Sequence, residues 1–417
     1  MRRLIAVSWE MPPMYGPRAS QVAATLAELA ERGWQPSVVC LDPRRGGPHW
    51  PDGTDAAVPA GVEMIRVPSP QESLAWRAAA SLIPIIRKMP DDQRLWVARA
   101  AVAVRASLAR QSVAGMITFG QPWSDHLVGV AVRRSNRIPW VAHFSDPWVD
   151  SPYLSAPDWL RRRWARMECA VIAQADAVVF VTEETADLVM GKYPEAWGGK
   201  VAVVPHGFVP RTSSSAAAPA VPRRDGPLRL VYTGRFYRGV REPLALFRAI
   251  AELHAAEPLD RTLEVVFMGP HVQEFQRDVT ALGIAGIVRV CGRRPKAEAD
   301  RLAADADVLL VIDAPSERAS VFLPSKLVDY LAFAKPLLGL TPAAGATARL
   351  LERLGCPVVQ PDDVAAIRAA IATLIERWRN GRLALAPAFH DVAGEYDIRR
   401  TTARLDAILV RAFRLAA

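Results

Sequence analysis

The chain contains 417 residues, of which 51% are apolar and 23% are charged, and its formal net charge at neutral pH is +9. Because single hydrophobic cores stop growing near roughly 250 to 300 residues, this length predicts two domains, and the composition excludes a disordered chain. No apolar run reaches the roughly 18 to 20 residues of a membrane-spanning helix. The positive charge indicates an anionic partner, which can be a phosphate-bearing substrate, a membrane surface or nucleic acid. The cysteines are too far apart in sequence for a CxxC pair, which predicts reduced thiols: Cys40, Cys169, Cys291 and Cys356.

Short apolar, β-branched runs alternate with helical patterns in the first half of the chain. Residues 4–7 predict a strand, residues 20–32 a helix and residues 36–41 a second strand. This order is typical of a parallel sheet with helices on both faces. Further strands are predicted at 62–67, 115–119, 139–144, 177–181 and 200–205. The first apolar run is too short for a signal peptide, so we expect a cytoplasmic protein.

A second series of strands and helices follows a stretch rich in Ser, Ala and Pro, which predicts an exposed connection. Strands are predicted at 228–234, 263–269, 287–292, 306–313, 336–340 and 357–360. Helices are predicted over 243–255, 271–282, 326–333 and 345–354. The sequence thus predicts two α/β domains, each a Rossmann-like, doubly wound parallel sheet.

We expect the first domain to span residues 1–208, the linker 209–227 and the second domain 228–387. The remaining residues, 388–417, predict a C-terminal helix that packs back on the first domain across the linker. This expectation rests on four apolar residues that would lie on one face of the helix: Ile398, Leu405, Ile408 and Leu409.

The loop after the first predicted strand, residues 8–20, places Gly16 and Arg18 close to the start of a helix. In open α/β sheets, ligands bind outside the carboxyl ends of the strands, where helix N-termini present free N–H groups. One interpretation is a phosphate- or sugar-facing loop in which Gly16 admits the ligand and Arg18 supplies a cation. The other is a proline-rich turn that leads into the helix. No GxGxxG or P-loop fingerprint occurs, which argues against an ordinary dinucleotide or P-loop site.

The second predicted domain opens with a strand, Gly234 and three arginines, Arg235, Arg238 and Arg241. Arginine offers a planar fork of donors that suits the oxygens of a diphosphate. The functional interpretation is therefore a diphosphate site in which Arg235 leads. The alternative is a solvated basic surface.

The segment 319–340 carries Ser325, Lys326 and Asp329 at the start of a predicted helix. We expect Ser325 to cap this helix and Lys326 to place a cation at its N-terminus, with Asp329 one turn further on. Together they offer a hydroxyl, a cation and a carboxylate to one ligand. The alternative is a plain helix ion pair worth about 0.3 to 0.5 kcal/mol.

Five motifs together resemble the GT-B glycosyltransferases, and within them the family-4 group of retaining enzymes. They are PPMYG (12–16), LAELAERGW (26–34), VVPHGF (203–208), the pair Gly234-Arg235 with Arg238-Gly239, and DYLAFAKPL (329–337). Two positions depart from the family pattern. His206 stands where an asparagine is usual, and Val321 stands where the first glutamate of an E-x7-E motif is expected.

The resemblance implies two domains that face a central cleft and a UDP- or GDP-sugar that serves as substrate, with no other cofactor and no metal ion. It implies retaining transfer of a hexosyl or hexosaminyl group to a glycan or lipid-linked acceptor, in polysaccharide or glycoconjugate biosynthesis. Arg235 and Lys326 would stabilise the departing diphosphate, a role in which single groups are typically worth about 3 to 4 kcal/mol. Asp329 would hold the ribose hydroxyls. The other expected donor contacts are Gly16, Arg18, Gly234, Arg241 and Ser325.

The segment AHFSDPWVD (142–150) resembles a post-strand motif of the same enzymes. Asp146 is the preferred candidate for activating or orienting the acceptor hydroxyl. His143 lies inside the strand pattern, where a buried structural histidine is the alternative to a site residue.

Residues 77–137 contain ten arginines and lysines but only three acidic residues. Apolar residues are interleaved with these charges, as in interfacial amphipathic segments that contact anionic lipid: Trp76, Leu82, Ile83, Ile85, Ile86, Trp96 and Val97. We expect peripheral attachment to the inner face of the cell membrane. The alternative is a set of ordinary helices with arginine-rich outer faces. Nucleic acid is not expected, because the aromatic residues form no stacking-platform pattern.

Two other functions fit the same donor motifs. A GT-B-fold epimerase would change the sugar without an acceptor. A non-catalytic nucleotide-sugar-binding scaffold is the third option, because Val321 replaces a glutamate.

Overall fold

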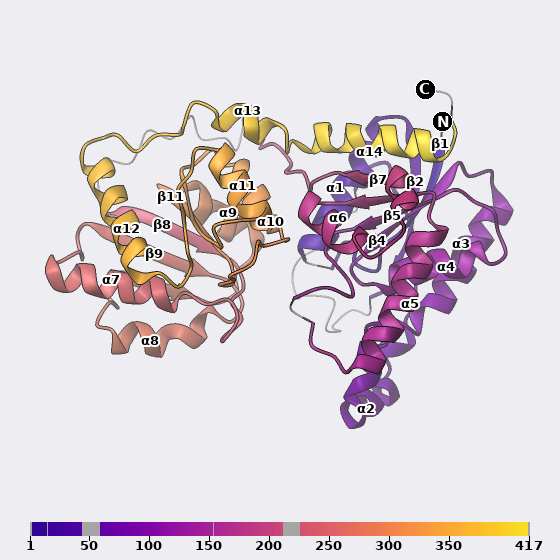
Figure 1. Cartoon of the computed structure of the whole chain (residues 1–417), viewed down its shortest axis with the longest axis horizontal. Helices are drawn as coiled ribbons and strands as arrows, with labels where there is room; N and C mark the ends of the chain where they lie inside the picture. Colours follow the sequence, from indigo (N-terminus) through magenta and orange to yellow (C-terminus); the bar gives the residue numbers. More distant parts are fainter. Residues whose placement is uncertain (1, 15, 44–58, 153, 212–225, 416–417) are drawn as a thin grey trace. The chain divides into compact units, whose positions relative to one another are not determined.

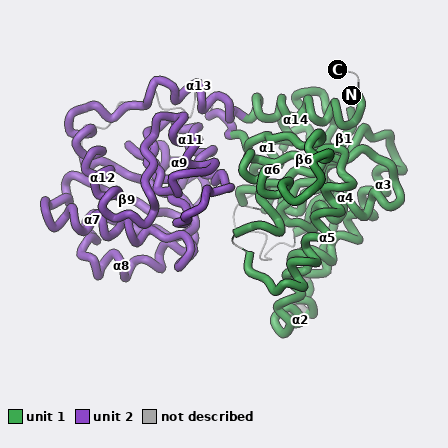
Figure 2. Tube along the Cα trace, in the orientation of Figure 1, with its two compact units in different colours: residues 1–207, 398–417 green, residues 208–397 purple. Residues whose placement is uncertain are grey.

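The computed structural model describes residues 2–14, 16–43, 59–152, 154–211 and 226–415. The chain forms two compact units, residues 1–207 with 398–417, and residues 208–397 (Figure 2). Most of the linker expected at 209–227 lies outside the described residues. In the described part of the chain, no helix is long and apolar enough to cross a bilayer.

Unit 1 contains a seven-stranded parallel sheet in the order β3-β2-β1-β4-β5-β6-β7. Its strands are β1 (Arg2–Val7), β2 (Trp34–Leu41), β3 (Glu63–Val67), β4 (Gly115–Gly120), β5 (Trp140–Phe144), β6 (Ala177–Phe180) and β7 (Val201–Val203). Its helices are α1 (Pro17–Glu31), α2 (Leu74–Leu82), α3 (Trp96–Arg110), α4 (Ser124–Arg133), α5 (Asp158–Gln174), α6 (Glu183–Met190) and α14 (Ile398–Ala412), with short 3-10 turns η1 (Pro70–Glu72), η2 (Pro84–Lys88) and η3 (Glu195–Lys200).

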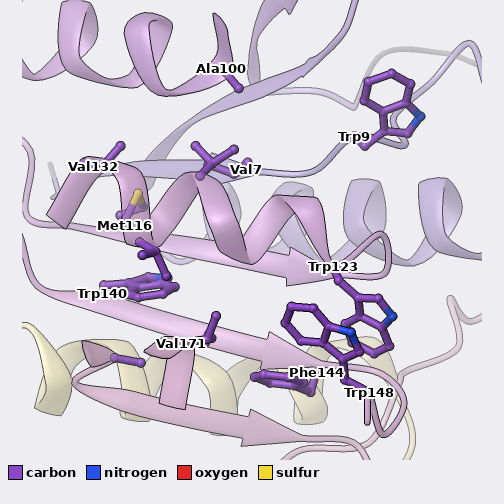
Figure 3. Packing of buried hydrophobic residues seen from close by; sticks show 14 of the residues in the cluster. Val7, Trp9, Ala100, Met116, Trp123, Val132, Trp140, Phe144, Trp148 and Val171 are labelled. Atoms are coloured by element: carbon purple, nitrogen blue, oxygen red, sulfur yellow. The ribbon is translucent and has the colours of Figure 1, made fainter. Parts of the chain in front are cut away.

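Two apolar cores cover the two faces of this sheet. Successive side chains of a strand point to opposite faces, so Ile5 and Val7 join the core with α3, α4, α5 and α6, part of which Figure 3 shows. Leu4 and Ala6 join the core on the other face, with α1 and α14. Figure 1 locates these two helices. The sheet order reverses between β1 and β4, and such a switch point is where an open α/β sheet binds ligands.

Unit 2 contains a six-stranded parallel sheet in the order β10-β9-β8-β11-β12-β13. Its strands are β8 (Leu228–Thr233), β9 (Leu263–Met268), β10 (Val288–Cys291), β11 (Val308–Ile312), β12 (Leu337–Leu340) and β13 (Val358–Val359). Its helices are α7 (Leu244–Ala256), α8 (Gln276–Ala281), α9 (Lys296–Ala304), α10 (Ser325–Leu331), α11 (Ala346–Arg353), α12 (Val364–Arg379) and α13 (Phe389–Gly394), with the 3-10 turn η4 (Val272–Phe275). The expected fold class, two doubly wound parallel-sheet domains, is confirmed.

The C-terminal residues divide between the units. Helix α14 belongs to unit 1, where all four residues of its predicted stripe are buried. The indole Nε1–H of Trp34 also donates to Asp406 Oδ1 of α14 over 2.7 Å. Helix α13, by contrast, belongs to unit 2.

Two local predictions are wrong. Ser325 does not cap α10: the helix begins at Ser325 itself, Pro324 holds the N-cap position, and no side chain makes a capping hydrogen bond there. Trp96 is not part of an exposed amphipathic surface, because its ring is fully buried and its Nε1–H donates to the Val67 carbonyl over 3.1 Å. Trp76, Ile85, Ile86 and Val97 are half-buried, whereas Leu82 and Ile83 are exposed.

Candidate functional site

Arg18 lies at the switch point of the first sheet. It is the second residue of α1, which has Gly16 at its N-cap. The guanidinium is buried, donates from Nη2 to the Gly120 carbonyl at the end of β4, and lies 5.6 Å from the centre of the Phe119 ring. Its Nε–H has no hydrogen-bond partner among the described residues. Nearly all buried polar groups in proteins are paired, so this donor is an exception among the described residues.

Gly16 provides space beside this cation. A Cβ at residue 16 would lie 3.1 Å from Glu10 Oε2, so the glycine lets the Glu10 carboxylate approach the start of α1. Its φ of −173° is extended backbone that any residue adopts, and the requirement here is one of space only.

Three carboxylates interact electrostatically with Arg18. Burial lowers the pKa of Arg18 to about 10, and the negative charges of Asp146, Asp125 and Glu10 oppose that shift. Arg18 therefore remains protonated at neutral pH. In return, its charge opposes the burial that raises the pKa of each of the three acids.

Asp146 follows Ser145 in the loop after β5. Ser145 Oγ lies 3.1 Å from Asp146 Oδ2 and 2.9 Å from the Gly120 carbonyl oxygen. The Gln121 amide donates to the same Oδ2 over 3.0 Å. These contacts hold the carboxylate at the common carboxyl end of β4 and β5, where the sequence predicted the acceptor-activating group.

Three histidines surround the same edge, and burial lowers the pKa of each. The pKa values of His126 and His206 fall to about 3, and that of His143 falls well below its usual range, with the Arg18 charge adding to the effect in all three. All three rings are therefore neutral at physiological pH. The His143 and His206 rings lie 6.1 Å apart, and His126 Nδ1 lies 2.8 Å from Thr118 Oγ1.

Several polar atoms of this cluster are buried without a hydrogen-bond partner in the described part of the chain. Besides Arg18 Nε they are Asp125 Oδ1, His126 Nε2 and His143 Nδ1. Sequence reasoning missed Glu10, Asp125 and His126. Their positions in the sequence could have identified them, because they follow β1 and β4, whose carboxyl ends lie side by side at the switch point.

In unit 2, Gly234 follows β8 and lies against Lys326. A Cβ at residue 234 would clash with Lys326 Cε and with the Tyr232 hydroxyl. The side chain of Lys326 therefore passes directly over the glycine at the carboxyl end of β8. The backbone of Gly269, after β9, also approaches Gly234, and it has a φ of +147° that favours glycine.

Helix α10 is fixed to β8 by a buried tyrosine. The Thr233 backbone N–H donates to the Tyr330 hydroxyl over 2.8 Å, and Thr233 Oγ1 lies 3.2 Å from the same oxygen. Because Tyr330 follows Asp329 in the helix, this contact also fixes the position of the carboxylate. The half-buried Ser325 begins the same helix.

The charges of α10 are shifted by their surroundings. Burial lowers the pKa of Lys326 to about 8, which the Asp329 carboxylate opposes. Asp329 keeps contact with solvent, but partial desolvation of its carboxyl raises its pKa to about 6, against the charges of Lys296 and Lys326. Lys296 forms a 2.7 Å ion pair with Asp300 on α9. Sequence reasoning missed this second pair.

The three arginines after β8 have different environments. Arg238 forms a 2.7 Å ion pair with Asp278, away from the others. Arg235 is exposed, and its guanidinium lies 5.9 Å from the centre of the Tyr237 ring. Arg241 lies 5.3 Å from the same ring and donates from Nη2 to the Arg235 carbonyl over 3.0 Å. Its charge lowers the pKa of Lys326 further, which places the two cations near each other.

Val321 lies in an extended segment next to α11. Its neighbour Ser320 pairs with the turn before that helix: the Ser320 N–H donates to Ala344 and the Ala346 N–H donates to Ser320, each over 2.9 Å. The segment thus keeps a fixed position, but it has no carboxylate at residue 321. Among the described residues, no group of three or more His, Cys, Asp or Glu side chains could hold a metal ion.

Two family models match the chain in succession. The model described as a glycosyl transferase 4-like domain matches residues 19–207, and the model for glycosyl transferases group 1 matches residues 227–377. The chain is a glycosyltransferase of the GT-B, group 1 type. A search of curated protein sequences finds no match.

Solved structures of glycosyltransferases share the fold of this enzyme over its full length. Sucrose-phosphate synthase from Thermosynechococcus elongatus superimposes with a TM-score of 0.71 at 16% identity, covering 99% of this chain and 100% of that one. WaaG, a glycosyltransferase involved in lipopolysaccharide biosynthesis, gives 0.64 at 16% identity, covering 97% and 99%. Trehalose 6-phosphate synthase from Burkholderia multivorans gives 0.63 at 16% identity, covering 99% of each chain. At these identities the likeness concerns the fold alone.

Proposed function

We propose that the enzyme transfers a hexosyl or hexosaminyl group from a UDP- or GDP-sugar to a glycan or lipid-linked acceptor, in polysaccharide or glycoconjugate biosynthesis. The observation that carries this proposal is the close approach of Lys326 to Gly234, with Asp329 on the same helix. A cation at the carboxyl end of a parallel strand suits a diphosphate, and a carboxylate one turn away suits ribose hydroxyls. A diphosphate and a ribose are the two parts that every nucleotide-sugar shares.

In the proposed reaction, the bond between the anomeric carbon and the diphosphate oxygen breaks, and its electron pair leaves with the diphosphate. A bond from the acceptor oxygen to the anomeric carbon forms on the same face, which retains the configuration. Asp146 takes the proton of the acceptor hydroxyl. Lys326, Arg235 and Arg241 offset the charge that develops on the diphosphate. Because these three cations supply that compensation, we propose a reaction that needs no metal ion.

The resemblance implied donor contacts for Gly16 and Arg18; both lie at the carboxyl edge of the sheet in unit 1, and we propose a different task for them. We assign the ordering of the acceptor and of the transferred sugar to this edge, because its free polar atoms are a mixture of donors and acceptors. Arg18 Nε is a donor, Asp125 Oδ1 is an acceptor, and the neutral imidazoles of His126 and His143 can be either. Hydroxyl groups both donate and accept hydrogen bonds, so they need both kinds of partner on the protein. Diphosphate oxygens only accept hydrogen bonds, so they need donors alone.

A screen with unlabelled nucleotides followed by a transfer assay tests this proposal. We expect UDP or GDP to raise the melting temperature, since a ligand at 100 times its Kd stabilises a protein by about 2.7 kcal/mol. The matching radiolabelled nucleotide-sugar should then lose its label to a glycan or lipid acceptor. Conversion of the sugar without any acceptor would indicate an epimerase and contradict the proposal, as would binding without turnover of any donor.

We also propose that one end of unit 1 contacts an anionic membrane. Leu82 and Ile83 at the end of α2 are 83% and 54% exposed, and Trp159 at the start of α5 is 48% exposed. The two segments are in contact, because Trp164 of α5 donates a hydrogen bond to the Lys88 carbonyl of η2, which follows α2, over 2.7 Å. Exposed cations accompany the apolar residues: Lys88, Arg94, Arg161 and Arg162. Apolar side chains flanked by cations are typical of interfacial lipid contacts.

Co-sedimentation with vesicles tests the membrane contact. We expect binding to phosphatidylglycerol vesicles that weakens with salt, little binding to phosphatidylcholine vesicles, and loss of binding in a Leu82→Asp, Ile83→Asp double variant. Val102→Asp is the matched control, because Val102 is also exposed but lies on α3. Vesicle binding that depends neither on lipid charge nor on salt concentration would contradict the proposal.

A further inference from the structure

Unit 1 contains a cavity that is not part of the Arg18 cluster but adjoins it. Its volume is about 330 Å³, at the lower end of the roughly 300 to 1,000 Å³ of small-molecule pockets. Three buried tryptophans, Trp123, Trp148 and Trp164, form its wall, and the exposed Leu154 and Lys88 lie at its rim. All of these residues lie in unit 1.

Two polar residues connect the cavity with its surroundings, Gln121 with Asp146 and Glu10 with the start of the Arg18 helix. Gln121 lines the cavity and at the same time donates to Asp146 Oδ2 over 3.0 Å. Glu10 also lines it, and its carboxylate lies against Gly16 at the start of the helix that carries Arg18. A molecule in the cavity would therefore contact the residues that surround Asp146.

The aromatic wall is rigid. The rings of Trp123 and Trp148 are stacked, with centroids 5.2 Å apart and planes 5° from parallel, and Figure 3 shows this pair beyond the ends of the neighbouring strands. Trp164 is held by its hydrogen bond to the Lys88 carbonyl. The Nε1–H of Trp148, in contrast, is a buried donor without a hydrogen-bond partner among the described residues.

The charges of the cavity disfavour an anion. Arg87 is already occupied, because its Nε and Nη2 bind Asp92 over 2.6 to 2.9 Å. Lys88 is the remaining cation among the lining residues, and the negative charges of Glu10 and Asp91 outnumber it. A purely apolar ligand is disfavoured as well, since it would displace water from the Glu10 carboxylate and from the Gln121 amide oxygen without replacing those hydrogen bonds. A neutral ligand with hydroxyl groups fits both conditions.

A sugar ring has these properties. Its C–H groups form an apolar face that packs on the electron-rich face or edge of an indole, and its hydroxyls donate to carboxylates and amide oxygens. We propose that this cavity binds a neutral pyranose ring of the acceptor, with Glu10 and Gln121 as its hydrogen-bond partners and a hydroxyl directed at Asp146. The inference rests on the proposed function, because it assigns the acceptor of the same reaction.

Saturation-transfer NMR on the full chain tests the cavity directly. The probes are the methyl pyranosides of glucose, galactose, mannose and N-acetylglucosamine, with cyclohexanol as an apolar probe and methyl glucuronide as an anionic one. We expect at least one neutral pyranoside to receive saturation and the other two probes to receive none. Saturation of no neutral pyranoside, or equal saturation of cyclohexanol or methyl glucuronide, would overturn the inference.

Two variants locate the signal. Leu154→Trp fills the rim of the cavity from an exposed position and should abolish the signal, whereas Leu188→Trp, on the exposed side of α6, should leave it unchanged. Glu10→Gln keeps the shape and should weaken binding about tenfold through loss of a charge-assisted hydrogen bond. A signal that persists undiminished in Leu154→Trp would place the sugar elsewhere and overturn the inference.

A parallel nucleotide titration separates this inference from the proposed function. UDP and GDP binding at Lys326 should be the same in Leu154→Trp as in the unchanged enzyme. If nucleotides bind and the donor is turned over but no pyranoside enters the cavity, the inference alone is wrong. If a pyranoside binds in the cavity but no nucleotide binds, the proposed function is wrong and the cavity remains a sugar site.

Discussion

The carboxyl edges of the two sheets differ in chemistry, although both sheets reverse their strand order in the same way. The edge of unit 1 holds one buried arginine among three acids and three neutral histidines. The edge of unit 2 holds Lys326 against Gly234 and two arginines in the following loop, with Asp329 as the acid on the helix of Lys326. The same fold thus presents a mixed hydrogen-bonding surface on one unit and a cationic surface on the other.

One architecture can therefore serve two ligands of different chemistry. Backbone glycines and cations suit a diphosphate, which only accepts hydrogen bonds, whereas a mixture of donors and acceptors suits hydroxyl groups. We therefore expect substitutions in unit 2 to act on the nucleotide and substitutions in unit 1 to act on the acceptor.

The largest effect is expected for Lys326→Ala. It should lower kcat/KM for the donor by about 10² to 10³, as is typical when one group that stabilises developing charge is removed. Donor kinetics measure this effect. Arg368→Ala is the control, since Arg368 is exposed and its 3.1 Å ion pair with Glu252 joins α12 and α7. Equal losses in both variants would refute a specific role for Lys326.

Asp146→Asn should lower kcat by about 10², the lower range for loss of a general base. UDP or GDP affinity, measured by calorimetry, should not change, because unit 2 binds the nucleotide in our proposal. Asp158→Asn, at the exposed start of α5, provides the control. A matching loss of nucleotide affinity in Asp146→Asn would remove the distinction between the two units.

Gly234→Ala should weaken donor binding about tenfold. The added methyl group must displace Lys326 Cε, whose flexible side chain can move, and it also crowds the buried Tyr232 ring, so the melting temperature of the variant is measured alongside. Gly198→Ala, where nothing lies within 4 Å, is the neutral comparison. Donor affinity in the alanine variant that equals that of the unchanged enzyme would show that the close approach is incidental.

A smaller effect is expected from pH. Burial lowers the pKa of Lys326 to about 8, so the residue is a cation below that pH and loses its charge above it. Nucleotide affinity should therefore fall several-fold between pH 7 and pH 9. Lys326→Arg stays charged and should show a flat profile over the same range. A parallel decline in both proteins would assign the pH dependence to another group.

The sequence predicted every strand of both sheets, and central strands such as β11 are the clearest, because a strand that is buried on both faces needs an uninterrupted apolar run. It also predicted that Lys326 and Gly234 serve one site, although their proximity depends on Tyr330, whose buried hydroxyl fixes α10 to β8. The spacing of the motifs alone does not predict this hydrogen bond.

Other parts of the site could not be predicted in this way. Asp125 and His126 read as ordinary polar residues at the start of a helix, and only the pairing of β1 with β4 brings them to Arg18. Ser325 has the composition of a cap, but Pro324 takes that position. Trp96 belongs to a charged, amphipathic stretch, yet packing against Trp9 buries it in the core.

The most direct test of the account is a calorimetric titration of UDP and GDP into the unchanged enzyme, Lys326→Ala and Arg18→Ala. We expect one nucleotide to bind the unchanged enzyme, Lys326→Ala to lose this binding, and Arg18→Ala to retain it within a few-fold. Loss of nucleotide binding in Arg18→Ala together with full binding in Lys326→Ala would contradict the assignment of the donor to unit 2.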